Sequence, residues 1–349
     1  MALTAPKLRV GINGCGRIGR AITRINLEKD AFDLVAINDV NPDIENVAYL
    51  LKYDSTYGRL RHSVAVADHH LLFDGIKKTA VYSEKSVALV PWQEHGVDVV
   101  IDASGNDLNL FALPELDRTS LRHCIVTNSP DQIYLDKSVI VGVNEQTLTP
   151  SDFVVSASIC DATAFVSVIH LLDRAFGIEY GSLTTLHPWL SYQRLLDGQA
   201  DGIYDPPEYG LGRASTTSLI PKPTTAVRAA AKIIPGIDDK FISMSYRVPT
   251  MIVSAADIVV KLARQVTKAE VVELFRDAEL RQRYPIIQNN FEPLVSADFT
   301  GSEYSAIVDQ RWTEVQGTGQ LKLVLWYDNE WGYSSRVVDL VTHLASLYD

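Results

Sequence analysis

Three glycines near the N-terminus limit most strongly what this chain can fold into. Gly14, Gly16 and Gly19 fit the pattern GxGxxG, in which the glycines allow a tight turn, close approach of a pyrophosphate and close packing of a helix on a strand. An apolar run at residues 8–12 precedes them, and isoleucines at helical spacing follow within residues 18–25. The pattern predicts a strand, a turn and a helix whose N-terminus faces a dinucleotide.

An acidic residue stands at the expected distance after the glycines. The apolar run at residues 34–37 ends at Asn38 and Asp39, about twenty residues beyond Gly19. A carboxylate there accepts a hydrogen bond from the ribose 2′-hydroxyl and repels a 2′-phosphate, so the sequence favours NAD over NADP. The predicted cofactor contacts in this half of the chain are Gly14, Gly16, Arg17, Ile18, Asp39 and Ser104.

The first half of the chain alternates short apolar runs with helical patterns. Further strands are expected at residues 97–101, 124–127 and 139–143. Alternation of this kind predicts a Rossmann-type, doubly wound parallel sheet within an α/β fold. We expect an NAD-binding domain at residues 1–158, completed by a C-terminal helix at residues 335–349.

From about Ser158 the pattern changes. Longer apolar runs at residues 246–253 and 321–327 alternate in the way that suits an antiparallel sheet covered on one face. Helical patterns lie between them at residues 226–234 and 268–276. This half predicts an α+β catalytic domain with a mainly antiparallel sheet, at residues 159–334.

Charge and composition argue against several functional classes. A formal net charge of −11 disfavours nucleic acid and anionic membranes as partners. No apolar stretch approaches the length of a membrane span, and Met1–Pro6 lack the basic and apolar regions of a signal peptide. We therefore expect a cytoplasmic protein that binds neither nucleic acid nor membrane.

The three cysteines do not form a recognisable disulfide or metal motif. Cys15, Cys124 and Cys160 are far apart in the sequence, so reduced thiols are expected, and no CxxC spacing is present. The neighbouring His69 and His70 fall in a polar, turn-like region that is more typical of solvated side chains than of a metal site. We predict no metal.

Cys160 is the candidate nucleophile. The apolar run at residues 154–159 precedes it and helical spacing follows, which predicts a strand-to-helix junction. A helix N-terminus lowers the pKa of a thiol and favours the thiolate. From these residues alone, an inert cysteine buried among apolar side chains remains an equal alternative.

A series of ordered motifs extends over nearly the whole chain. They are GINGCGRIGR at residues 11–20, AIND at 36–39, LLKYDS at 50–55, GR at 58–59, GVN at 142–144, TTLH at 184–187, RVPT at 247–250 and WYDNEWGY at 326–333. With these motifs the chain resembles the glyceraldehyde-3-phosphate dehydrogenase family, which includes erythrose-4-phosphate dehydrogenase. Members of this family are commonly tetramers, so the resemblance implies a homotetramer.

The resemblance also implies roles for individual residues. Cys160 would be the nucleophile that forms a thioester with an aldehyde, and His187 would be its base. Arg247 would bind the phosphate of a sugar-phosphate aldehyde. Asn329 would hold the nicotinamide carboxamide, and Tyr333 would pack beside the ring. Thr224 stands at the position of an anion-binding threonine, and Arg213 lies in a loop that could reach the same pocket.

The chain departs from the family pattern around the nucleophile. Ile159 replaces a hydroxyl residue and Asp161 replaces a threonine, which removes donors where inorganic phosphate attacks and adds a repelling charge. Equally, Asp161 could merely complement the helix N-terminus. Leu190 and Tyr192 also stand where glycolytic members carry threonines.

These departures leave three readings open. The first is oxidation of glyceraldehyde 3-phosphate or erythrose 4-phosphate, with phosphate as the acceptor of the acyl group. In the second, water replaces phosphate and the enzyme releases a free acid. In the third, the chain is a cofactor-binding regulatory protein that has lost turnover, which the retention of Cys160, His187 and Arg247 disfavours. The sequence does not decide which aldehyde is the substrate.

Overall fold

A computed structural model describes residues 7–200 and 209–348 of the chain. Met1–Pro6, on which the argument against a signal peptide rests, lie outside the described residues. The chain divides into two compact units. The first unit contains the described residues up to Ile159 and those from Ser334 onward, and the second contains Cys160–Tyr333.

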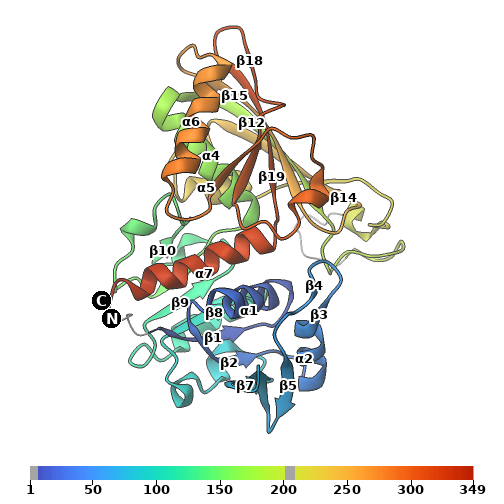
Figure 1. Cartoon of the computed structure of the whole chain (residues 1–349), viewed down its shortest axis with the longest axis vertical. Coiled ribbons are helices and arrows are strands. Elements are labelled where there is room, and N and C mark those ends of the chain that lie inside the picture. The colour runs from blue at the N-terminus through green and yellow to red at the C-terminus, as the bar shows by residue number, and fades with distance from the viewer. Residues whose placement is uncertain (1–6, 201–208, 349) are drawn as a thin grey trace. The chain divides into compact units, whose positions relative to one another are not determined.

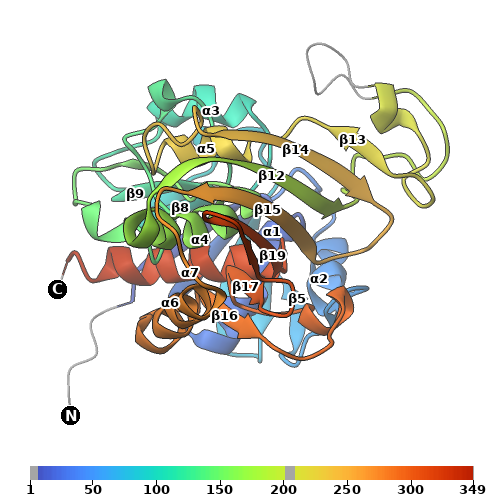
Figure 2. The ribbon, with the colours of Figure 1, turned by 90° about the horizontal axis from the view of Figure 1, so that it is seen from above.

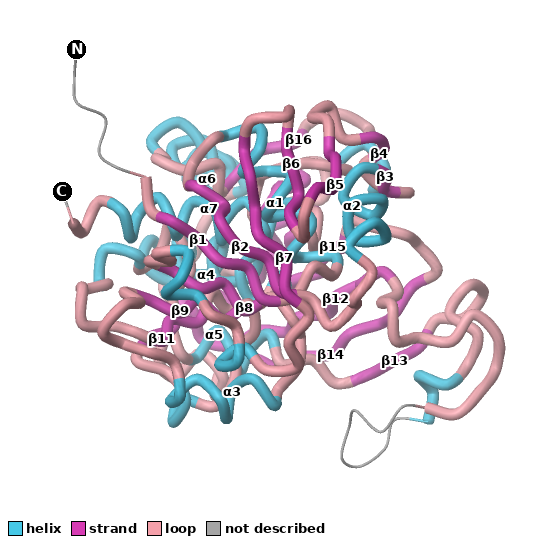
Figure 3. Tube along the Cα trace, turned by 90° about the horizontal axis from the view of Figure 1, so that it is seen from below, coloured by secondary structure: helices cyan, strands magenta, loops and turns pink. Residues whose placement is uncertain are grey.

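The first unit is built on a nine-stranded sheet with the order β10-β11-β9-β8-β1-β2-β7-β6-β5 (Figure 3). All neighbours from β10 to β7 are parallel, and β5 and β6 form an antiparallel edge. Strands β8 and β9 are buried at every residue, as parallel strands covered on both faces should be. The predicted parallel sheet is thereby confirmed. Its strands are β1 (Arg9–Asn13), β2 (Asp33–Asn38), β5 (Val64–Ala67), β6 (His70–Phe73), β7 (Lys77–Tyr82), β8 (Val99–Asp102), β9 (His123–Val126), β10 (Lys137–Ser138) and β11 (Val154–Ser156).

Two helices of this unit begin in different ways. The Asp43 side chain caps the start of α2 by accepting hydrogen bonds from two backbone N–H groups, whereas Gly16 at the start of α1 provides no capping side chain. The first turn of α1 is therefore open to an external anion. The remaining elements of the unit are α1 (Arg17–Lys29), α2 (Ile44–Lys52), the hairpin of β3 (Tyr53–Asp54) and β4 (Gly58–Arg59), η1 (Val87–Leu89), η2 (Trp92–His95), α3 (Leu108–Ala112), η3 (Leu113–Glu115), η4 (Gln132–Tyr134), η5 (Glu145–Thr147) and the part of α7 (Trp331–Ala345) from Ser334 onward.

The strand expected at residues 139–143 is wrong. The chain leaves β10 after Ser138 and turns, with Gly142 at a φ of 88° and the side chain of Asn144 accepting from the backbone N–H of Ile140. The apolar residues of this run are buried although they do not form a strand. Their apolar character therefore reflects a buried turn.

The second unit contains an eight-stranded sheet of mainly antiparallel pairing, as predicted (Figure 2). The order is β13-β14-β12-β15-β19-β17-β16, with β18 paired to β19. Only β12 with β14 and β16 with β17 are parallel. The strands are β12 (Ile178–Pro188), β13 (Ile220–Lys222), β14 (Phe241–Val248), β15 (Ser254–Leu262), β16 (Ile287–Asn290), β17 (Ala306–Asp309), β18 (Glu314–Gln316) and β19 (Gln320–Tyr327).

Helices α4 (Cys160–Phe176), α5 (Ala226–Ala231) and α6 (Lys268–Arg281) lie along one face of this sheet (Figure 1). Residues alternate between buried and less buried along β15 and β19, so each strand turns one set of side chains toward the helices. The short helices η6 (Tyr209–Gly212) and η7 (Ser296–Phe299) complete the unit. Within the described ranges, no helix combines the length and the apolar character needed to cross a membrane.

The strand expected at residues 246–253 is only partly correct. Strand β14 ends at Val248, directly before Pro249, because proline lacks the N–H that the ladder requires. The next residues form a turn in which Val253 has a φ of 69°, and β15 begins at Ser254.

Candidate active site

Three elements of the second unit bring the candidate catalytic residues together. Helix α4 begins at Cys160, and strand β12 carries His187 near its end. Strands β12 and β14 are parallel, and their register places Arg247 directly beside His187. Paired residues of neighbouring strands point to the same face, so both side chains are presented on one side of the sheet.

The thiol and the imidazole face each other. Sγ of Cys160 lies 3.7 Å from Nε2 of His187. The other ring nitrogen, Nδ1, lies 2.8 Å from the carbonyl oxygen of Pro188, which can only accept a hydrogen bond. Nδ1 therefore carries the proton of the neutral ring, and the lone pair of Nε2 points to the thiol.

Asp161 lies beside both groups and forms a three-residue cluster with Cys160 and His187. Its Oδ1 lies 3.5 Å from Sγ of Cys160 and 3.9 Å from Nε2 of His187. The hydroxyl of Tyr327 donates to the same oxygen at 2.9 Å, and Thr185 Oγ1 lies 3.3 Å from Oδ2. Asp161 is buried, so it contacts the reactive groups directly and does more than neutralise the helix terminus.

The expectation of a lowered thiol pKa is reversed by the structure. Burial and then the negative charge of Asp161 raise the pKa of Cys160 well above its usual value. Arg247 acts in the opposite direction without cancelling these effects. The raised pKa favours the protonated thiol, which can donate to either Asp161 or His187.

His187 is held neutral. Burial and the nearby guanidinium of Arg247 lower its pKa to about 4, although Asp161 acts to raise it. A neutral imidazole at pH 7 is a proton acceptor, which is the state that a general base requires.

Arg247 is buried rather than paired at the surface. Its Nη2 donates to the hydroxyl of Tyr192 at 3.2 Å, and its Nη1 lies 3.5 Å from the carbonyl oxygen of Pro188. Its Nε is buried and has no partner among the described residues. Among the described residues its hydrogen-bond partners are neutral oxygens, so this buried cation is suited to receive an anion.

The two remaining predicted anion ligands have other contacts. Arg213 forms an exposed ion pair with Asp197, with 3.0 Å between Nε and Oδ2. Oγ1 of Thr224 accepts from the backbone N–H of Ala226 at 3.2 Å. Their part in anion binding stays a prediction.

In the first unit, the glycine motif has the geometry that a dinucleotide site needs. Gly14 has a φ of 94°, and a Cβ there would lie 2.5 Å from Cα of Ser104. A Cβ on Gly19 would lie 2.0 Å from the carbonyl oxygen of Gly14, so the helix packs closely on the turn. A Cβ on Gly16 would meet nothing within 4 Å, which leaves space before the uncapped start of α1.

Other predicted cofactor residues are placed as follows. The carboxylate of Asp39 accepts from the backbone N–H groups of Cys15 and Asn41 at 2.7 and 2.9 Å, and it sits at the end of β2. The guanidinium of Arg17 is paired with Asp54, so its contribution to a phosphate would come from its backbone N–H.

Asn329 and Tyr333 belong to the second unit and are both buried. Oδ1 of Asn329 has no partner among the described residues, so a ligand amide could donate to it. Burial and the neighbouring Cys160 raise the pKa of Tyr333 well above its usual value, which keeps the ring neutral.

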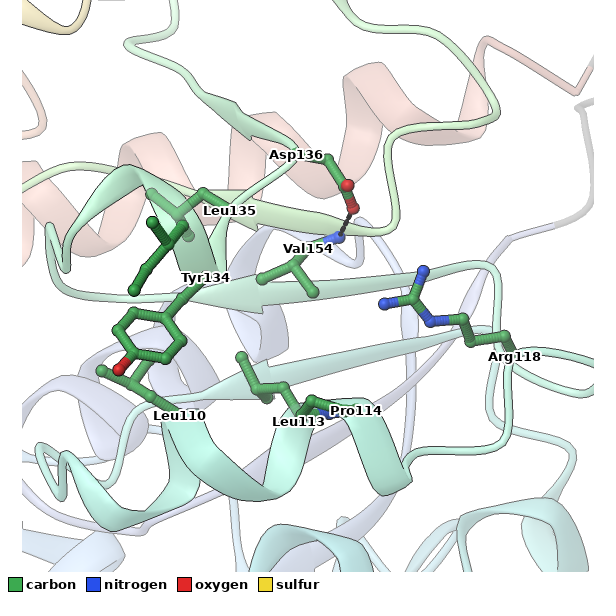
Figure 4. A pocket seen from close by; sticks show the side chains of 9 residues that line it. Leu110, Leu113, Pro114, Arg118, Tyr134, Leu135, Asp136 and Val154 are labelled. Carbon is green, nitrogen blue, oxygen red and sulfur yellow. Dashed lines mark hydrogen bonds between the residues drawn. The ribbon is translucent and has the colours of Figure 1, made fainter.

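A separate hollow of about 140 Å³ lies in the first unit (Figure 4). Leu110, Leu113 and Val154 contribute apolar walls, but none of the predicted site residues lines it. Its charged groups are already engaged: Asp136 accepts from the backbone N–H of Val154 at 2.7 Å, and Arg118 stacks on the ring of Phe153. The hollow therefore contains none of the predicted catalytic or cofactor-binding residues.

The sequence assigned no site contact to three residues that the structure places against the predicted site. Tyr327 and Thr185 bind Asp161, and Tyr192 binds Arg247. Thr185 and Tyr327 lie inside motifs that resemble the family, so the sequence marked both residues as candidates. It did not indicate their contact with Asp161, because that contact depends on how α4, β12 and β19 pack together.

Two family models match the sequence. "Glyceraldehyde 3-phosphate dehydrogenase, NAD binding domain" matches residues 8–109, and "Glyceraldehyde 3-phosphate dehydrogenase, C-terminal domain" matches residues 159–329.

Curated relatives resemble the chain over nearly its full length. It is 35% identical to "Glyceraldehyde-3-phosphate dehydrogenase, cytosolic" of Gracilaria gracilis, with 99% of this chain and 100% of the relative covered. It is 36% identical to "Glyceraldehyde-3-phosphate dehydrogenase 3" of Saccharomyces cerevisiae, with 97% and 99% covered. A cytosolic relative from Craterostigma plantagineum is 34% identical, with 97% and 99% covered.

Proposed function

This chain belongs to the glyceraldehyde-3-phosphate dehydrogenase family, and on that premise we propose that it oxidises a phosphorylated aldehyde through a thioester on Cys160. The substrate would be of the glyceraldehyde 3-phosphate or erythrose 4-phosphate type. The observation that carries the proposal is the cluster in which Sγ of Cys160 faces the unprotonated Nε2 of His187 beside the buried Arg247. A regulatory protein without turnover would not need all three.

Cys160 and His187 would carry the covalent steps. Sγ bonds to the aldehyde carbon as the thiol proton passes to Nε2, and the carbonyl oxygen takes up that proton to give a thiohemiacetal. Nε2 then removes the hydroxyl proton while hydride leaves the same carbon, and a thioester remains. The acceptor finally displaces the acyl group and Cys160 is restored.

The hydride acceptor would be bound NAD. The open space at Gly16 and the uncapped first turn of α1 would suit a pyrophosphate, and Asp39, directly after β2, would accept a hydrogen bond from a ribose hydroxyl. The unpartnered Oδ1 of Asn329 fits the amide of the nicotinamide. Arg17, Ile18, Ser104 and Tyr333 would complete the contacts.

Arg247 would orient the substrate by its phosphate. Its unpartnered Nε and its neutral neighbours leave the positive charge available to an anion. Tyr192 occupies Nη2, so a phosphate would share the guanidinium with this hydroxyl or displace it. Thr224 and Arg213 are the further candidates for this anion.

A second candidate outcome is release of a free acid. The carboxylate of Asp161 lies 3.5 Å from Sγ, where it would repel an incoming phosphate ion and would not repel water. Water would then cleave the thioester.

Steady-state assays over a panel of aldehydes test both outcomes. We expect phosphorylated aldoses to be oxidised with higher kcat/KM than their unphosphorylated counterparts, because only they carry an anionic group that Arg247 can bind. Each assay is run with and without inorganic phosphate, and the product is identified as acyl phosphate or acid. No oxidation of any member of the panel in the presence of NAD would contradict the proposal.

Asp39→Ala is expected to narrow the preference for NAD over NADP. The carboxylate would bind a ribose hydroxyl and repel a 2′-phosphate, so its removal should weaken NAD binding and strengthen NADP binding. We expect the ratio of kcat/KM with NAD to kcat/KM with NADP to fall by about tenfold or more. The matched control is Asp33→Ala, an exposed residue at the opposite end of β2. Equal efficiency with both cofactors in the unmodified enzyme would refute this reading.

We also infer that the protein is a homotetramer of the cytoplasm. The family resemblance supports the assembly, and two of the relatives carry "cytosolic" in their names. Light scattering coupled to size-exclusion chromatography would measure the assembly directly.

A further inference from the structure

We propose that Cys160, Asp161 and His187 form an inhibitory site for a thiophilic divalent cation of the Zn²⁺ class. The three side chains come from α4 and β12, and each offers one ligand atom to a common point. The site departs from the expectation of no metal, which rested on sequence spacing and therefore could not detect ligands from separate elements. Metal binding depends on this geometry alone, whereas its inhibitory effect rests on the oxidation proposed above.

The spacing of the ligand atoms suits a tetrahedral ion. The three pairs are separated by 3.5 Å (Sγ to Oδ1), 3.7 Å (Sγ to Nε2) and 3.9 Å (Nε2 to Oδ1). With zinc bonds of about 2.3 Å to sulfur and about 2.0–2.2 Å to nitrogen and oxygen, tetrahedral ligands stand roughly 3.3–3.6 Å apart. Shifts of about half an ångström or less would close the site.

The surroundings already orient two of the ligands. Nδ1 of His187 donates to the carbonyl oxygen of Pro188, which directs the lone pair of Nε2 into the cluster. The hydroxyl of Tyr327 donates to Asp161 and fixes the carboxylate. Hydrogen bonds of this kind to histidine and carboxylate ligands are typical of protein zinc sites.

Charge balance favours the same ion. Binding displaces the proton of the Cys160 thiol to solvent, so the ligands become one thiolate, one carboxylate and one neutral imidazole. Two negative charges then balance the divalent cation among buried groups, beside the one positive charge of Arg247. Sulfur and imidazole select Zn²⁺ over Mg²⁺ or Ca²⁺, which prefer oxygen. The metal would bind the sulfur atom that must attack the aldehyde, so it would reversibly inhibit the oxidation.

Titration of the full-length protein with Zn²⁺ tests the site without any assay of turnover. We expect one equivalent to protect Cys160 from alkylation, as mapped by mass spectrometry, and Mg²⁺ to give no protection. Co²⁺ used as a spectroscopic probe should produce the thiolate-to-metal charge-transfer band of a tetrahedral site, and Cys160→Ser should abolish that band.

Asp161→Asn examines the contribution of the carboxylate. We expect it to weaken Zn²⁺ binding by at least about tenfold, while Asp277→Asn, at a half-exposed acid of α6 that pairs with Arg281, leaves the affinity unchanged. Equal affinity in Asp161→Asn and the unmodified protein would overturn the three-ligand site. Independently of any variant, alkylation of Cys160 at an undiminished rate in excess Zn²⁺ would overturn metal binding there.

Discussion

Cys160→Ala abolishes aldehyde oxidation and leaves NAD binding nearly unchanged: this is the largest effect that we expect. The variant removes the atom that would bond to the aldehyde carbon, so kcat should fall by at least about 10³-fold. NAD contacts assigned to the glycine motif and Asp39 lie in the first unit and are not altered. Turnover is measured by NADH absorbance, and NAD binding is measured by calorimetry.

A matched cysteine separates loss of chemistry from loss of packing. Cys124 is fully buried in β9, and burial raises the pKa of its thiol far above the usual range. Cys124→Ala should therefore cost stability, by about 1 kcal/mol for the small cavity, without lowering kcat. Retained oxidation in Cys160→Ala would refute the assignment of the nucleophile.

Restoring hydroxyls on both sides of the nucleophile should make the reaction depend more on phosphate. In Ile159→Ser combined with Asp161→Thr, an apolar group and a repelling charge give way to two donors at a helix N-terminus that favours anions. Facing like charges are strongly unfavourable, so we expect stimulation by phosphate to increase by about tenfold or more. Initial rates over a phosphate series and the proportion of acyl phosphate formed measure it.

The same carboxylate should also control the reactivity of the thiol. Asp161 is a cause of the raised pKa of Cys160, so Asp161→Thr lowers that pKa and shifts the pH profile of alkylation to lower pH. Below the thiol pKa, each unit of this shift makes alkylation about tenfold faster. Two results contradict this account: a saturable phosphate requirement already present in the unmodified enzyme, and an unchanged alkylation profile in Asp161→Thr.

The sequence predicted the parts of the fold that local pattern determines. Alternation and buried apolar runs located β1, β2, β8, β9 and β19, and helical spacing located α1, α4 and α6. The errors occurred where apolar residues serve another purpose. Residues 139–143 fill a buried turn, and the run at residues 246–253 is interrupted after Val248 by proline. Hydrophobicity reports burial in both cases but does not report backbone conformation.

The candidate site was predictable as a set of residues but not as an electrostatic environment. The helix N-terminus alone favours a thiolate at Cys160, yet burial and Asp161 act more strongly in the folded protein. The depth to which Cys160 is buried cannot be obtained from its neighbours in the sequence. The contact of Asp161 with Tyr327 cannot be obtained either, because the two residues are 166 positions apart in the chain. Both features depend on long-range packing, which local sequence patterns do not report.

The parallel register of β12 and β14 links correct folding to chemical competence. His187 and Arg247 are directly paired residues, so the proton acceptor and the anion binder share one face in this alignment. Side chains alternate along a strand, and a slip by one residue would turn one of the two toward the opposite face. A single insertion or deletion within either strand would therefore give a chain that retains its thiol, base and cation and yet cannot bring them to one substrate. The number of residues within each of these strands is thus under the same constraint as the motif residues themselves.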